Sequence, residues 1–333
     1  MSKEFYAPGL MDLSGYHLDI VEDVDWDKFV VQSEQGTIFN SSIFLNALDE
    51  PIKKWGCYKG SELKGGICTA EDGTAMFRPK LCIYNSLMLQ AADSQQARAN
   101  QFAEEFRTIS ALTKTLTEKY NSIQFQTHYS LQDLRPLLWH NFGTELKKFS
   151  CTPRFTTTIQ FTDKYPFEGE LNNNPLYSQC SKSRRQEIRY AINKDVNVIK
   201  QLDLGLFQDL YRKTFERQNI AVDEEQLRQI TYVCKVLHEQ KLLSMYIASD
   251  QAGDIGSIAV FAHDQGKAYY LYGANSAIAK TAHTGSYIIY FACDDLFKAG
   301  NDEIDLEGVN SPARGHFKMS FGGQLQTYFS VAM

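Results

Sequence analysis

The residues best suited to chemistry lie near the end of the chain, in the segment EIDLEGVNSPARGHFKMSFGGQLQTYF from Glu303 to Phe329. A run with strand character ends at Glu307, and a polar loop follows. Lys318 then stands between Phe317 and Phe321. An ammonium group desolvated by aromatic neighbours can stabilise the negative charge that develops on a carbonyl oxygen during acyl transfer. The alternative is a turn whose lysine extends past the rings into water.

Attack of an amine on an activated carbonyl also needs a group that accepts the proton of the amine. Glu307, at the end of the expected strand, could accept it directly or through water. It fits equally well as a carboxylate that only pairs with Arg314 or Lys318. His316 is a second candidate base. A lone histidine in a loop is more often exposed or structural, so Glu307 ranks first and the choice between them stays open.

A basic helix is expected over Ser181 to Lys194, which reads SKSRRQEIRYAINK. Arg185 and Arg189 lie one helical turn apart, so their guanidinium groups point the same way. Two such groups suit bidentate contact with an anionic acceptor such as a diphosphate. The competing interpretation is a solvated helix face on which they pair with Glu187 or Asp195.

Further candidate substrate contacts lie on or near the expected strands of the second half. In the segment YYLYGAN, Tyr272 stands beside a glycine and close to Asn275, which favours a position facing a cleft. Tyrosines on strands more often pack in the core. Asn310, in the loop after Glu307, is a third candidate contact.

The elements that must position these residues occur in two runs of similar order. The first run ends with a long helix that is expected to begin at Asp93 with Gln96 three residues on, as in a capping box, followed by a strand and a short helix. The second run reads strand, loop, helices, three strands, helix, strand, loop, strand. The expected elements of the second run are a strand at 154–161, a loop at 162–175, helices at 181–194, 203–218 and 223–240, strands at 243–248, 256–262 and 268–272, a helix at 284–298, and strands at 303–307 and 324–331.

Composition indicates a globular protein with a large core. The chain has 333 residues, of which 43% are hydrophobic and 13% aromatic, and its length favours two domains, expected at 1–150 and 151–333. No apolar run approaches the roughly 18 residues of a membrane span, and the first residues lack the apolar centre of a signal peptide, so we expect a cytoplasmic location. The net charge of −6 argues against DNA binding. Seven scattered cysteines show no metal-ligand spacing, so no metal site is expected.

The C-terminal segment resembles the signature of the Fem-type peptidyltransferases, in which an acidic strand end is followed by a Phe-Lys-x-x-Phe-Gly element. The order of elements in the second run is similar to that of the acetyltransferase-type (GNAT) fold, and the first run repeats it more loosely. The resemblance covers most of the chain, from Asp25 to Phe329. It implies an α/β (α+β) protein of two tandem GNAT domains, with mixed, mostly antiparallel sheets flanked by helices. It also implies that Lys318 is the catalytic lysine.

The resemblance further implies an N-acyltransferase of cell-wall (peptidoglycan) biogenesis. Such an enzyme moves an aminoacyl or acyl group to an amine of a cell-envelope or nucleotide-linked precursor, with aminoacyl-tRNA or an acyl thioester such as acyl-CoA as donor and no tightly bound cofactor. The segment His283 to Ser286 has one glycine and no arginine, which speaks against the usual CoA pyrophosphate loop. The helical arm that binds tRNA in some members is absent, and Glu307 replaces a small residue. The alternative is a non-catalytic scaffold that binds a ligand or partner in a groove between the domains.

Overall fold

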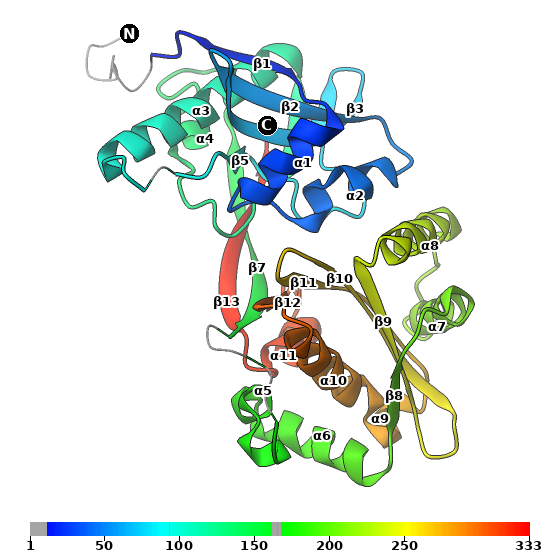
Figure 1. Cartoon of the computed structure of the whole chain (residues 1–333). Helices are drawn as coiled ribbons and strands as arrows, with labels where there is room; N and C mark the ends of the chain where they lie inside the picture. Colours follow the sequence, from blue (N-terminus) through cyan, green and yellow to red (C-terminus); the bar gives the residue numbers. More distant parts are fainter. Residues whose placement is uncertain (1–11, 93, 162–164, 166–167) are drawn as a thin grey trace. The chain divides into compact units, whose positions relative to one another are not determined.

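The computed structural model describes residues 12–92, 94–161, 165 and 168–333 (Figure 1). The chain divides into two compact units. One contains the residues up to Arg154 together with Thr327–Met333, and the other is Phe155–Gln326. The division falls within two strands, β7 (Ser150–Gln160) and β13 (Gln324–Ala332), so the last residues of the chain belong with the first unit.

The first unit is built on a mixed sheet. Its other elements are β1 (Tyr16–Ile20), α1 (Asp23–Gln32), α2 (Ser42–Asn46), β2 (Ile52–Lys59), β3 (Glu62–Asp72), β4 (Ala75–Phe77), β5 (Met88–Leu89), α3 (Arg98–Lys119), β6 (Ser122–Gln126) and α4 (Arg135–Leu138). The strand order is β1-β2-β3-β4-β6-β13, with β5 on β3. Helix α3 places Ile109, Leu112 and Leu116 in a core shared with the sheet, because these residues recur at helical spacing. Trp26 of α1 is fully buried, and its Nε1 donates to the Asn40 carbonyl at 2.6 Å.

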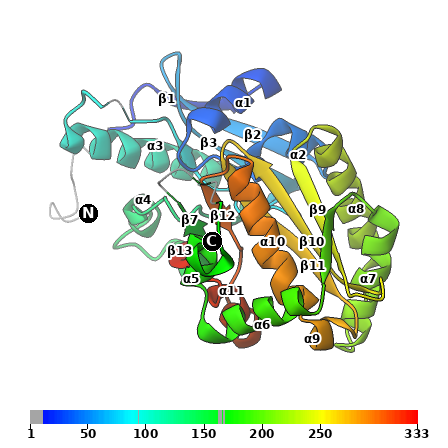
Figure 2. The ribbon, with the colours of Figure 1, turned by 60° about the horizontal axis from the view of Figure 1, so that its bottom comes forward.

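The second unit carries the C-terminal signature. Its other elements are α5 (Pro175–Gln179), α6 (Lys182–Asn193), β8 (Asn197–Lys200), α7 (Leu204–Glu216), α8 (Glu224–Glu239), β9 (Leu243–Ser249), β10 (Ile255–Asp264), β11 (Lys267–Asn275), α9 (Ala279–Ala282), α10 (Thr284–Lys298), β12 (Glu303–Asp305) and α11 (Pro312–Met319). The strand order is β13-β7-β12-β11-β10-β9-β8. Helices α6 and α10 share one buried apolar cluster with this sheet (Figure 2). Helices α7 and α8 bury their apolar residues outside that cluster.

Two neighbouring strands of the second unit separate at the point where the signature begins. β11 pairs in parallel with β12 only from Lys267 to Tyr269, opposite Glu303 to Asp305. Beyond Tyr269 this edge of β11 has no β12 residue opposite it, while β11 continues to Asn275 against β10. The part of β11 that lacks this pairing therefore lies next to the residues that follow β12.

The structure differs from the expected elements in places that matter for the site. Lys318 lies on a helix, α11, and not in the loop expected between β12 and β13. Helix α5 and strands β4 and β8 were not expected. The long helix begins at Arg98, and the expected capping residue Asp93 lies outside the described residues. The loop expected at 162–175 also lies partly outside them.

Candidate active site

A cavity in the second unit, which we call the lysine hollow, surrounds Lys318. Its volume is about 450 Å³. It is formed where α7 and α11 meet the free part of β11. The residues that line it are Tyr211, Thr214, Phe215, Gln218, Tyr270, Leu271, Tyr272, Gly273, Asn275, Ala313, Arg314, Phe317 and Lys318. Three residues predicted from the sequence, Lys318, Tyr272 and Asn275, are thus brought together.

Helix α11 places Lys318 in this cavity. The helix begins with Pro312, whose missing N–H and fixed φ suit a first helical position. It ends before Gly322, whose φ of +87° lets the chain turn into β13. Lys318 Nζ lies 5.4 Å from the centroid of the Tyr270 ring, a cation–π distance. Burial lowers the pKa of Lys318, while the charge of Glu307 partly opposes this effect.

Glu307 is buried and is not among the residues that line the cavity. Only 5% of its surface is exposed, and its backbone N–H donates to Asp305 Oδ1 at 2.7 Å. Its φ of +59° is a left-handed conformation that costs a non-glycine residue about 1 kcal/mol or more. Within the described part of the chain, Glu307 Oε1 has no hydrogen-bond partner. Burial raises the pKa of Glu307 well above its usual range, although Lys318 acts in the opposite direction.

The two tyrosines of β11 do not share one face, because the strand contains a bulge. The register with β10 shifts so that Val260 lies opposite Tyr272 and Phe261 opposite Tyr270. The Tyr270 ring contacts Phe261, whereas Tyr272 contacts Phe207 of α7. Both nevertheless line the lysine hollow. A side chain at Gly273 would overlap the Tyr270 hydroxyl, so a glycine is needed there.

A second cavity, which we call the arginine hollow, adjoins the first. Its volume is about 590 Å³, and it lies at the start of α10. Its lining residues are Arg184, Glu187, Thr214, Arg217, Gln218, Asn275, Ser276, Lys280, His283, Gly285, Ser286 and Phe317. Four of these residues, Thr214, Gln218, Asn275 and Phe317, also line the lysine hollow. The two hollows therefore lie side by side and share part of their wall.

Asn275 stands at the junction of the two hollows and is held in place by its neighbours. Its Oδ1 accepts from the Ser257 hydroxyl at 2.7 Å, and its backbone N–H donates to Thr214 Oγ1 at 3.0 Å. Its carbonyl oxygen accepts from the guanidinium of Arg217. These hydrogen bonds fix the position of Asn275, which lines both cavities.

Arg184 links the arginine hollow to the frame of Lys318. Its Nε donates to Ser320 Oγ at 2.9 Å and its Nη1 to Glu187 Oε2 at 2.5 Å. Its guanidinium lies 4.4 Å from the ring centroid of Phe317 and 4.8 Å from that of Phe321. Burial lowers the pKa of Arg184, and Glu187 opposes this. Arg184 therefore ties α6 to the two phenylalanines that flank Lys318.

The other predicted site residues lie elsewhere. Arg185 donates to the Ser178 carbonyl at 3.4 Å, and neither it nor the exposed Arg189 lines either hollow. His316 is exposed and lines neither hollow. Asn310 uses both side-chain groups on the backbone of Phe155, at 2.8 and 3.0 Å.

Sequence reasoning missed several residues of the two hollows. Arg184 precedes the buried Ile188 by four residues and Ala191 by seven, so its place on the buried face of the basic helix could have been predicted. Arg217 and Lys280 carry no comparable signal, because their positions depend on the packing of α7 and of the turn before α10.

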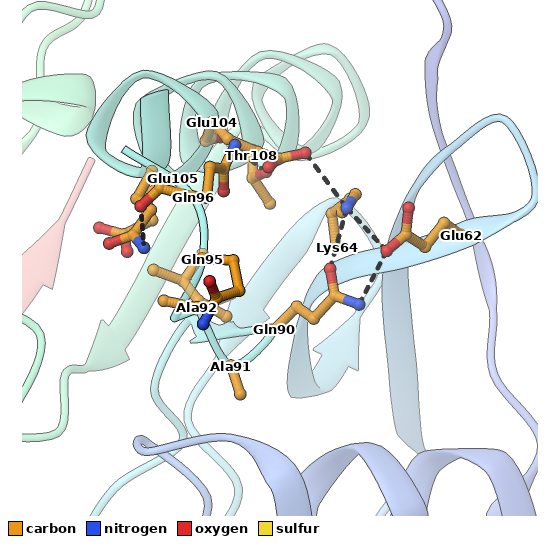
Figure 3. Close-up of a pocket in the computed structure, with 12 residues that line it drawn as sticks. Glu62, Lys64, Gln90, Ala91, Ala92, Gln95, Gln96, Glu104, Glu105 and Thr108 are labelled. Carbon is orange, nitrogen blue, oxygen red and sulfur yellow. Dashed lines mark hydrogen bonds and ion pairs between the residues drawn. The ribbon is translucent and has the colours of Figure 1, made fainter. Parts of the chain in front are cut away.

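The first unit also has a cavity at the start of its long helix, but with different chemistry (Figure 3). Its volume is about 440 Å³. Among the described residues, the one cation that lines it is Lys64, which is paired with Glu62 at 2.7 Å and Glu104 at 3.2 Å. Glu105 adds a further carboxylate, whose pKa is raised by burial. These acidic groups oppose binding of a phosphorylated or oxyanionic ligand.

Two features of other classes of protein are absent from the described residues. No three or more His, Cys, Asp or Glu side chains in the described ranges are arranged to hold a metal ion. Among the helices that the structure describes, none has both the length and the hydropathy required to cross a bilayer.

Comparison with solved structures confirms the predicted fold. The chain is similar to FemX, with a TM-score of 0.64 and 14% identity over 94% of this chain and 96% of that one. The chain is also similar to a conserved protein of unknown function from Bacteroides thetaiotaomicron, with a TM-score of 0.57 and 12% identity over 95% of this chain and 99% of that one. A third similar structure is a tandem GNAT protein from the clavulanic acid biosynthesis pathway, with a TM-score of 0.52 and 8% identity over 95% of this chain and 97% of that one. No protein-family model and no curated protein sequence matches the chain.

Proposed function

We propose that the second unit is an acyltransferase that moves an acyl or aminoacyl group from an activated donor to an amine. The observation that carries this proposal is Lys318, a half-buried cation in a cavity that adjoins a second, cationic cavity. The tandem GNAT fold that the chain shares with FemX supports it, although fold alone names no substrate.

The donor extends through both hollows in this proposal. Arg217 and Lys280 in the arginine hollow bind its phosphate groups, which the start of α10 also favours. Its ester or thioester carbonyl then reaches Lys318 through the junction at Asn275. Both aminoacyl-tRNA and acyl-CoA have this layout, with phosphates at some distance from the reactive carbonyl.

The reaction joins the acceptor nitrogen to the carbonyl carbon of the donor. The carbonyl oxygen becomes negative in the tetrahedral intermediate, and Lys318 stabilises that charge. The bond from carbon to the donor oxygen or sulfur then breaks, and the proton lost by the amine ends on this leaving group. Glu307 relays the proton through water in this proposal, since burial raises the pKa of its carboxyl group and so makes it a better proton acceptor than an exposed glutamate.

The physiological acceptor that we propose is a cell-envelope or nucleotide-linked precursor with a free amine, modified by a cytoplasmic enzyme. The test incubates the protein with radiolabelled alanyl-tRNA or acetyl-CoA and an extract of precursors, and identifies N-acylated products by mass spectrometry. Arg217→Gln and Lys280→Gln should raise the KM for the donor by about tenfold each, through loss of charge-assisted contacts. Absence of any acylated product with both donors would favour a scaffold that only binds ligands.

A further inference from the structure

Arg314 is a second cation of the lysine hollow, and the sequence gives no reason to place it there. It lies on α11 one helical turn before Lys318, and both residues line the cavity. Arg314 is exposed, whereas Lys318 is half-buried. The charge of Arg314 lowers the pKa of Lys318 and also opposes the rise that burial causes in the pKa of Tyr211. The guanidinium therefore acts on both the α11 and the α7 walls of the cavity.

No aspartate or glutamate of the described residues lines the lysine hollow. The charges of Glu307 and Asp305 act on Lys318 from outside that lining. Within the described part of the chain, Arg314 makes no ion pair and no hydrogen bond through its side chain. Since the guanidinium of Arg314 is left available at the cavity wall, the occupant is expected to bring a negative charge of its own.

The remaining walls of the lysine hollow are largely aromatic. Five rings line it, those of Tyr211, Phe215, Tyr270, Tyr272 and Phe317. Aromatic walls with a few placed polar groups suit a ligand with an apolar body. A cavity of about 450 Å³ admits a group of the size of an amino acid rather than a large cofactor.

We propose that the acyl acceptor is an amino acid or a peptide end with a free carboxylate, and that Arg314 binds this carboxylate. The acceptor amine then lies near Lys318, because residues four apart on a helix are neighbours about 6 Å apart. Its apolar body lies among the aromatic rings. Arg314 is a specificity-determining residue in this arrangement. The assignment of the carboxylate to the acceptor rests on the proposed acyl transfer, whereas carboxylate binding itself does not.

The first experiment measures binding without any reaction. Calorimetry compares 3-phenylpropionate with 3-phenylpropionamide, which share the ring and differ only in the charged group. The parent protein should bind the acid about tenfold more tightly than the amide, and Arg314→Gln should remove that difference. The matched control is Arg228→Gln, an exposed arginine of α8 that should keep the preference. Equal binding of acid and amide by the parent, or a preference that survives in Arg314→Gln, overturns the proposal.

The second experiment distinguishes an acceptor carboxylate from one on the transferred acyl group. Phenylalanine and phenylalaninamide compete as acceptors with alanyl-tRNA or acetyl-CoA as donor, and mass spectrometry quantifies the two products. Preferred acylation of phenylalanine, lost in Arg314→Gln, supports the proposal. If phenylalanine and phenylalaninamide are acylated equally while 3-phenylpropionate is still bound preferentially, the carboxylate that Arg314 binds does not belong to the acceptor, and this part of the proposal is overturned. If Arg314 discriminates the probes but neither donor yields a product, carboxylate recognition stands and the proposed acyl transfer fails.

Discussion

Lys318 and Glu307 shift each other's pKa against the effect of burial, although no ion pair joins them within the described residues. Burial drives both groups towards their neutral forms, and the opposite charge of the partner partly restores ionisation. The two side chains act on each other through space, from the residues after β12 to helix α11. Because no carboxylate is bonded to it, the Lys318 ammonium stays available to the cavity that it lines.

The first prediction concerns Lys318→Met, which keeps the volume of the side chain and removes its charge. Because the charge acts mainly on the transition state, turnover should fall by about 10²-fold or more while acceptor affinity stays nearly unchanged. Lys318→Arg should restore little activity, since a planar guanidinium cannot replace a compact ammonium between two phenylalanines. Steady-state kinetics and calorimetry provide the measurement, and Lys235→Met on the exposed face of α8 is the control. A turnover within threefold of the parent, as an order-of-magnitude criterion, would contradict the role of Lys318.

The second prediction concerns the pH dependence of stability and Glu307→Gln. The pKa of folded Glu307 is raised above its ordinary value of 4.5, so the folded protein retains a proton that the unfolded chain releases. The stability linked to this proton is complete below pH 4.5 and is lost as the pH rises towards the higher pKa of the folded state. Since glutamine does not titrate, the free energy of unfolding of the variant should fall less over this window.

Urea unfolding at a series of pH values tests this prediction. Glu225→Gln, at an exposed ion pair of α8, is the control and should follow the parent. Parallel pH profiles for the parent and Glu307→Gln would show that the buried carboxyl group has no such linkage.

The third prediction concerns Gly273→Ala. The added Cβ would overlap the Tyr270 hydroxyl, so Tyr270 must move away from its place beneath Lys318. We expect a loss of about 1 to 3 kcal/mol in the free energy of unfolding, together with reduced turnover. Adding Tyr270→Phe should recover part of the stability, because it removes the clashing oxygen.

Gly205→Ala on α7 provides a matched control for this substitution. The nearest atom to its added Cβ is 3.7 Å away, which is ordinary contact. Its effect should range from neutral to a gain of about 0.5 to 1 kcal/mol, as expected for alanine in a helix. Equal stability of both single variants would mean that Tyr270 has room to move freely.

The fourth prediction separates a structural from a substrate-binding role for Asn310. Asn310→Ala should cost about 1 kcal/mol of stability, since its amide bonds both the N–H and the carbonyl of Phe155. Acceptor affinity should not change. A loss of affinity at unchanged stability would return Asn310 to the substrate site.

Much of the fold was predictable because the second unit has strong local patterns. The three strands from β9 to β11 are runs rich in apolar residues that are joined by turns rich in Asp and Gly, so both their existence and their pairing followed from the sequence. Helix α11 was not predictable in this way. Its sequence contains Pro312 and Gly315, and its stability depends on Arg184 stacking on Phe317, a contact between distant parts of the chain.

The candidate site was predictable only in part, for a related reason. Lys318 stood out as a charge between aromatic residues, and Glu307 as an acidic residue at the end of an expected strand. The choice of Arg185 and Arg189 relied on the polar face of α6, whereas the arginine that lines a cavity, Arg184, lies on its buried face. The bulge in β11 has no clear sequence signal, so the different surroundings of Tyr270 and Tyr272 required the structure.

The residues Thr327–Met333 have a consequence for the order in which the protein can be made. They supply the strand residues that pair with β6, where Val331 lies opposite Phe125 and is fully buried. When the residues up to Arg154 have left the ribosome, the sheet of the first unit therefore still lacks one strand and exposes the edge of β6. Since the whole of the second unit is translated before that strand, the first unit completes its folding last, although its synthesis begins first.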